Sequence, residues 1–172
     1  MWARRMLPIA IVLMATTSAI AASPRPGTTH HVDEYAVIGR FLMAVDDYVV
    51  THRWVETLGP EARCAPREGR IFFPSVAELF RQRIAETIRR HDVNPADLVS
   101  DMDEAEWMAP PIVVNDALPW GFDNPAAAWL VERLPRLPED MDYRVIGRDL
   151  VLYDVRDAIV ADVLRDAILL GR

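Results

Sequence analysis

The hydrophobic pattern of this chain changes along its length, and the change limits the folds that it can adopt. From residue 31 to residue 58, apolar residues follow the spacing of a helix. Near the C-terminus, residues 142–146 and 150–153 are rich in β-branched and aromatic residues and flank Gly147-Arg148-Asp149, which predicts a hairpin. We therefore expect an α+β fold with three to four helices and a C-terminal antiparallel β-hairpin or small meander.

Four helices are predicted, over residues 31–58, 76–91, 95–102 and 125–134. Gly59-Pro60 ends the first helix, as Gly followed by Pro commonly does. Ser75-Val76-Ala77-Glu78 has the pattern of a capping box and starts the second. Asn94-Pro95 and Asn124-Pro125 each place Pro after an N-cap residue and start the third and fourth. The expected apolar stripe of the first helix consists of Tyr35, Ile38, Leu42, Val45, Val49, Val50, Trp54 and Leu58.

Two segments are less regular. Residues 103–124 contain Pro110, Pro111 and Pro119 and predict a loop region with a short strand-like run at residues 112–114. Residues 158–164 fit both the alternation of a strand and one face of a helix, so both assignments stay open.

The N-terminus has the features of an export signal. Arg4 and Arg5 precede a short apolar run, and Ala19-Ile20-Ala21 fits a cleavage site. A membrane anchor is the alternative, but the apolar stretch is shorter than the roughly 20 residues that a span needs. We interpret residues 1–21 as a signal peptide, 22–30 as a flexible lead and 31–172 as a single globular domain. The expected location is periplasmic or secreted, with no membrane span after cleavage.

Charge and cysteine content exclude several classes of protein. All 19 basic residues are Arg, against 26 acidic residues, and loss of Arg4 and Arg5 with the signal changes the net charge from −7 to −9. A nucleic-acid partner and an anionic membrane surface are therefore not expected. The single cysteine, Cys64, cannot form an intramolecular disulfide, so it is either a free thiol or pairs between chains.

Three parts of the sequence resemble an uncharacterised family of secreted bacterial proteins, for which the resemblance implies no activity. These parts are residues 134–138 with 142–154, residues 70–74 leading into 80–85, and residues 114–120. Residues 143–164 are also similar to the C-terminal β-meander of small periplasmic proteins of nickel and cobalt homeostasis. This second resemblance favours a third strand over residues 158–164.

His30, His31, Asp33 and Glu34 are the candidate metal ligands of the sequence. Imidazole and carboxylate groups near one helix start can share a borderline cation. Alternatively, Asp33 and Glu34 only offset the helix dipole. No Cys₂His₂-type spacing accompanies them, so a closed zinc site is not expected.

Other groups of charged residues have simpler explanations. His52 and Glu56 share a helix face, for which a solvated contact is the expected role. The acidic run at residues 101–106 does not match the EF-hand pattern and is interpreted as a solvated loop. The second helix carries four arginines, and we expect them to be structural rather than to hold an anionic ligand: Arg81, Arg83, Arg89 and Arg90.

The sequence predicts a non-enzymatic envelope module that binds an unidentified protein or small ligand, with no cofactor. No serine lies in a nucleophile elbow and no glycine-rich phosphate loop is present. A homodimer through the first helix is one option. The alternatives are metal handling through the His30 cluster and a carboxylate-dependent hydrolase, since paired acids are recognised only by their geometry.

Overall fold

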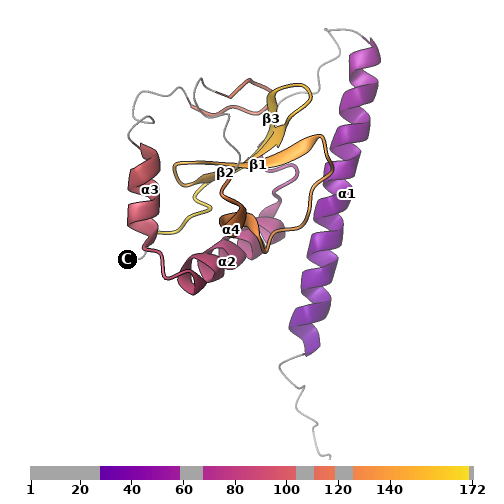
Figure 1. The fold of residues 1–172 in the computed structure, drawn as a ribbon. Helices are drawn as coiled ribbons and strands as arrows, with labels where there is room; N and C mark the ends of the chain where they lie inside the picture. Colours follow the sequence, from indigo (N-terminus) through magenta and orange to yellow (C-terminus); the bar gives the residue numbers. More distant parts are fainter. Residues whose placement is uncertain (1–27, 59–67, 104–110, 119–125, 171–172) are drawn as a thin grey trace, which may run out of the picture.

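The computed structural model describes residues 28–58, 68–103, 111–118 and 126–170. Within these residues the fold is α+β, with helices followed by a C-terminal antiparallel meander, as predicted (Figure 1). The helices are α1 (Thr28–Leu58), α2 (Pro74–Arg90), α3 (Pro95–Asp103) and α4 (Ala128–Val131). The strands are β1 (Met141–Ile146), β2 (Asp149–Asp154) and β3 (Ile159–Leu164).

The three strands form an antiparallel sheet in the order β1-β2-β3. Ile146 pairs with Asp149, so Gly147 and Arg148 form a two-residue turn, and Gly147 has the positive φ of +54° that such a turn requires. Residues 159–164 are a strand, which decides between the two assignments that the sequence left open. A register shift opposite Leu152 and Tyr153 marks a bulge in the pairing of β2 with β3.

Both faces of the sheet are covered, which is why five of the six residues of β3 are buried. One face packs on the helices, in a core around Phe41, Phe72, Phe80 and Tyr143, whose rings make edge-on or stacked contacts. Burial raises the pKa of Tyr143, and its neutral hydroxyl donates a hydrogen bond to the Pro135 carbonyl at 3.1 Å.

The other face of the sheet is covered by residues 112–118. Ile112 and Val114 pack against the β-sheet residues Ile146, Val151, Val160 and Val163. The strand-like run predicted at residues 112–114 is not a strand in the structure. The chain turns immediately after it, with a positive φ at Asn115, and the Asn115 N–H and the Asp116 carbonyl both bond to the backbone of Val160 in β3.

A buried carboxylate joins β3 to the segment that leads into α2. Asp162 is 0% exposed, and its two oxygens accept four backbone N–H groups. Oδ1 accepts those of Gly69 at 2.7 Å and Val163 at 2.8 Å, and Oδ2 accepts those of Ile71 at 2.6 Å and Phe72 at 2.8 Å. A buried carboxylate is tolerated when hydrogen bonds replace its hydration, and here each oxygen accepts two.

Asp162→Asn should therefore destabilise the protein strongly at nearly constant volume. The new NH₂ group faces two backbone N–H donors, which lose their acceptor, and each unsatisfied buried donor costs about 1–3 kcal/mol. We expect a loss of about 3 kcal/mol in the free energy of unfolding, measured by urea denaturation. The matched control Asp116→Asn, at an exposed site, should change it by less than about 0.5 kcal/mol. Equal stability of both variants would contradict this role for Asp162.

The capping box predicted at Ser75 is wrong. Helix α2 begins two residues earlier than predicted, at Pro74, and its N-cap residue Phe73 makes no side-chain capping bond. Pro74 takes the first helical position, where its fixed φ suits the helix, and this places Ser75 inside the first turn. The Ser75 hydroxyl accepts instead a long 3.4 Å hydrogen bond from Arg40 Nη2.

The cap predicted at Asn94 is confirmed, and the helix after it ends within one residue of the expected position. Asn94 Oδ1 accepts the N–H of Ala96 at 3.1 Å, at the start of α3. Helix α4 is shorter than predicted. It begins at Ala128, after the N-cap residue Ala127, and Asn124-Pro125 lie outside the described residues.

Ser75→Ala and Asn94→Ala form a matched pair that tests these two caps. Removing the Asn94 cap should cost about 1 kcal/mol, the usual value for an N-cap asparagine. Ser75→Ala removes no capping bond and should cost less than about 0.5 kcal/mol. Chemical denaturation of both variants would measure this difference. A larger loss of stability in Ser75→Ala than in Asn94→Ala would mean that Ser75 caps α2 after all.

Several expectations fall on residues that the structure does not describe. These are the signal peptide over residues 1–21, most of the lead, the end of α1 at Gly59-Pro60, Cys64 and the acidic residues 104–106. Helix α1 begins at Thr28 and so takes up residues 28–30 of the expected flexible lead. Among the helices described, none combines the length and the hydropathy that a membrane span requires.

Candidate functional site

The outward side of α1 is the candidate functional surface. Helix α1 lies at one edge of the molecule and extends past the body on which it packs (Figure 1). Its inner side contributes Phe41 and Val45 to the core, both 0% exposed. Its opposite side exposes four large apolar residues, which we call the outer face: Tyr35 at 73%, Met43 at 66%, Val50 at 68% and Trp54 at 63%.

The predicted apolar stripe of α1 is corrected by this arrangement. Val45 is buried as predicted, but Tyr35, Val50 and Trp54 point to solvent, and Phe41 takes a central place in the core. The reason is that α1 carries apolar residues on all its sides. Spacing alone cannot then identify the inner side.

Acidic groups accompany the outer face. Asp46 and Asp47 are exposed between Met43 and Val50 in the sequence. The nearby arginines turn to their own chain: Arg40 donates to Ser75 and lies 5.3 Å from the centre of the Phe73 ring, and Arg53 pairs with Asp140. The surface therefore combines apolar contact area with carboxylates.

The structure places the four predicted metal ligands in the first turns of α1. The side chains of His30 and His31 lie outside the described part of the chain, and Asp33 is exposed. Glu34 has a structural partner, because its Oε1 accepts Arg83 Nε at 3.1 Å and Nη2 at 2.6 Å. The predicted metal site at these residues stays a prediction.

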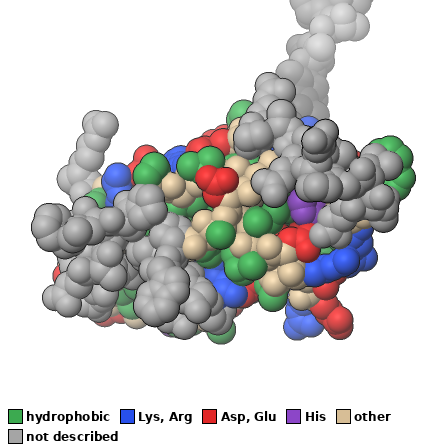
Figure 2. All heavy atoms as spheres, turned by 90° about the horizontal axis from the view of Figure 1, so that it is seen from above, with side chains coloured by type: hydrophobic (Ala, Val, Ile, Leu, Met, Phe, Trp, Pro, Cys, Tyr) green, Lys and Arg blue, Asp and Glu red, His purple; other side chains and the backbone are tan. Residues whose placement is uncertain are grey.

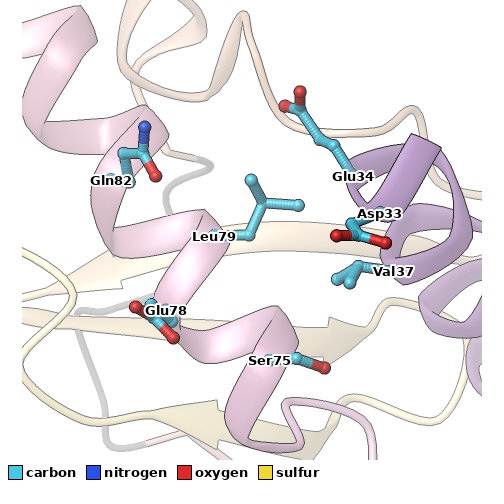
Figure 3. Close-up of a pocket in the computed structure, with 7 residues that line it drawn as sticks. All are labelled: Asp33, Glu34, Val37, Ser75, Glu78, Leu79 and Gln82. Carbon is cyan, nitrogen blue, oxygen red and sulfur yellow. The ribbon is translucent and has the colours of Figure 1, made fainter. Parts of the chain in front are cut away.

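A groove of about 330 Å³ separates α1 from α2 (Figure 3). Leu79 of α2 points toward α1, whose Val37 and Asp33 line the other side. Ser75, Glu78 and Gln82 of α2 and Glu34 of α1 complete the lining. The groove is wide and open, no histidine is among these lining residues, and the Ser75 hydroxyl contacts Arg40. Three carboxylates, of Asp33, Glu34 and Glu78, line the groove, and that of Glu34 is held by Arg83, so the carboxylate-dependent hydrolase stays a prediction.

The four arginines of α2 act structurally, as predicted. Arg83 also donates to the Arg133 carbonyl at 2.7 Å, and Arg81 donates to the carbonyls of Arg165 and Asp166. Arg90 pairs with Glu132, and Arg89 donates to Ala85. Each of the four guanidinium groups therefore makes at least one contact within the chain.

His52 has a partner that the sequence did not predict. Its Nε2 lies 2.9 Å from Asp157 Oδ2, in the turn between β2 and β3, and Asp154 lies beside them. The sequence analysis missed this group because it joins residues about 100 positions apart, which no local spacing reveals. The side chain of Glu56 lies outside the described residues.

Comparisons with known proteins add little to this geometry. No protein-family model matches the chain, and no curated protein matches it. Among solved structures, the chain is similar to the C-terminal domain of inner membrane protein CigR from Salmonella enterica, with 14% identity and a TM-score of 0.39, over 56% of this chain and 94% of that one. A likeness at this level supports no inference about function. The resemblances seen in the sequence stay predictions.

Basic and acidic side chains are mixed on the face that Figure 2 shows, and the expected lack of a nucleic-acid partner stays a prediction. Arginine side chains lie there beside acidic ones, and the described residues of this face form no continuous basic patch. Nucleic-acid binding requires such a patch to neutralise phosphates.

Truncating Phe41 and Met43, which lie on opposite sides of α1, would show which side stabilises the isolated chain. Phe41→Ala empties part of the core and should lower the free energy of unfolding by about 3–5 kcal/mol. Met43→Ala, on the outer face, should change it by less than about 0.5 kcal/mol. Thermal or urea unfolding of both variants would measure the difference. A large loss for Met43→Ala would mean that the isolated chain already covers this side.

Proposed function

We propose that this protein is a non-enzymatic interaction module of the cell envelope, which binds a helix of a partner protein along the outer face of α1. The observation that carries the proposal is the row of four exposed apolar side chains on the outer face of α1. From Tyr35 to Trp54 the row is roughly 30 Å long, because a helix rises about 1.5 Å per residue. This length suits a partner helix of about 20 residues packed side by side with α1.

The charges favour a basic partner over a second copy of this chain. If two copies paired antiparallel through Tyr35 and Trp54, Asp46 and Asp47 of both would meet near the centre of the interface. Four carboxylates in one interface repel each other, and the chain carries a net charge of −7 that opposes self-association. A partner helix with Arg or Lys beside its apolar residues would instead be complementary to Asp46 and Asp47.

A lipid surface fits this face less well than a protein helix. Helices that lie on membranes combine apolar residues with Lys and Arg, which attract anionic headgroups. The outer face has carboxylates in those places. The envelope location of the module rests on the export signal predicted at residues 1–21.

Two synthetic helical peptides of equal length provide a direct test. Both carry the same Leu and Ala stripe, one with Lys and the other with Glu at the flanking positions, and binding is followed by the fluorescence anisotropy of a dye on the peptide. We expect the Lys peptide to bind at least tenfold more tightly than the Glu peptide, with an affinity that falls as salt is added.

The variant Met43→Glu/Val50→Glu should lose this binding, because it places charges in the centre of the apolar row. The control Val155→Glu/Leu169→Glu changes two other exposed apolar residues, 47% and 53% exposed, and should bind as the wild type does. Equal loss in both variants, or equal binding of both peptides, would refute the proposal. A concentration-dependent dimer that Met43→Glu/Val50→Glu abolishes would show that a second copy is the occupant.

A further inference from the structure

The side chain of His52, from α1, converges with those of Asp154, at the end of β2, and Asp157, in the turn that follows. Each offers one ligand atom, and the three atoms lie within 4.8 Å of one another. His52 Nε2 and Asp157 Oδ2 are already 2.9 Å apart. We propose that these three residues form a binding site for a divalent transition-metal cation of the Zn²⁺ type.

The site lies in a partly enclosed place. Asp154 is 5% exposed, and the side chains of His52 and Asp157 are 24% and 19% exposed. A carboxylate that is this well buried is costly unless a positive charge or hydrogen bonds compensate it. A divalent cation would balance the two carboxylates, while the remaining exposure leaves a path for the ion and for water to complete its coordination.

The surrounding contacts leave suitable oxygens for a metal. Asp154 Oδ1 accepts the backbone N–H groups of Arg156 and Asp157, both at 3.1 Å, which fixes the carboxylate and the turn after it. Asp154 Oδ2 accepts the Tyr48 hydroxyl at 3.2 Å. An oxygen has room for a metal beside one such hydrogen bond, so Oδ2 is the metal-binding atom in this arrangement.

Tyr48 orients two of the three ligands. Besides its hydrogen bond to Asp154, its ring stacks on the His52 imidazole, with the ring centres 5.3 Å apart and the planes 13° from parallel. Neighbours that hold ligands in place in this way raise metal affinity.

The donor set indicates the class of metal. One imidazole nitrogen and two carboxylate oxygens suit borderline cations such as Zn²⁺, whereas Ca²⁺ and Mg²⁺ prefer oxygen ligands alone. Ligand atoms of a tetrahedral zinc ion lie about 3.4 Å apart, since each is about 2.1 Å from the metal. Binding therefore requires the His52–Asp157 pair to open slightly, which rotation of these two more exposed side chains can provide.

This site is separate from the proposed protein-binding surface. His52 and Trp54 are two residues apart on α1, so their side chains leave the helix about 200° apart. It is also separate from the metal ligands predicted at His30 and His31, which lie six turns away toward the start of α1.

Calorimetric titration of the purified chain with Zn²⁺, after treatment with a chelator, tests the site. We expect one Zn²⁺ per chain, and binding at least tenfold weaker in His52→Gln and in Asp157→Asn. Tyr48→Phe should weaken binding by roughly tenfold, as removal of an outer-shell partner commonly does. Circular dichroism checks that each variant is folded, and Asp157→Asn is the mildest change because it keeps the shape of the side chain.

Two control variants locate the bound ion. His91→Ala changes a half-exposed histidine near Glu132, and the double variant His30→Ala/His31→Ala removes the predicted N-terminal ligands. Both should bind Zn²⁺ as the wild type does, and Zn²⁺ should raise their melting temperatures but not that of Asp157→Asn. The proposal is overturned if the wild type binds no Zn²⁺, if Asp157→Asn binds equally well, or if binding is lost only with His30 and His31.

Discussion

The carboxylate of Asp162 is the interaction on which the rest of the fold depends. It lies in the last strand, yet three of its four N–H partners come from residues 69–72, about 90 positions earlier in the chain. Those bonds fix the backbone just before α2 and so place Ile71 and Phe72 in the core. Phe72 stacks on Phe41 of α1, with ring centres 6.0 Å apart, so the position of α1 also follows from it. A charge without solvent contact thus orients the helices relative to the sheet.

Arginine side chains make a second set of connections, at the rim of the core. Arg165 donates to Glu68 and Asp149 and to the carbonyl of Ile112, which lie in three separate segments. The hydrogen bonds that Arg165 donates to the Glu68 and Asp149 carboxylates hold its pKa above the usual range. A guanidinium group has five donors in a rigid plane and can join several acceptors at once, whereas a lysine ammonium cannot match this geometry. The chain has no Lys, and its arginines serve largely as links within the fold.

Local signals explain what the sequence could predict. The hairpin at Gly147 and the cap at Asn94 depend on residues a few positions apart, and the structure has both. Ser75 shows the limit of such signals, because the neighbouring Pro74 takes the first helical position and the helix starts two residues earlier than predicted. Features set by distant contacts could not be predicted: the inner side of α1 depends on where Phe72 and Phe80 lie, and the partner of His52 is in a turn more than 100 residues later.

The two sides of α1 have complementary roles in the function that we propose. A surface binds more tightly when it is held rigid before the partner arrives, because less conformational entropy is lost on binding. The core holds α1 through Phe41 and Val45, near its middle. Further along, the Tyr48–Asp154 and His52–Asp157 contacts attach the helix to the turn after β2, two residues from Trp54 and Val50 of the outer face. A metal ion at this point would strengthen that attachment from the inner side. The affinity of the outer face would then depend on residues that never touch the partner.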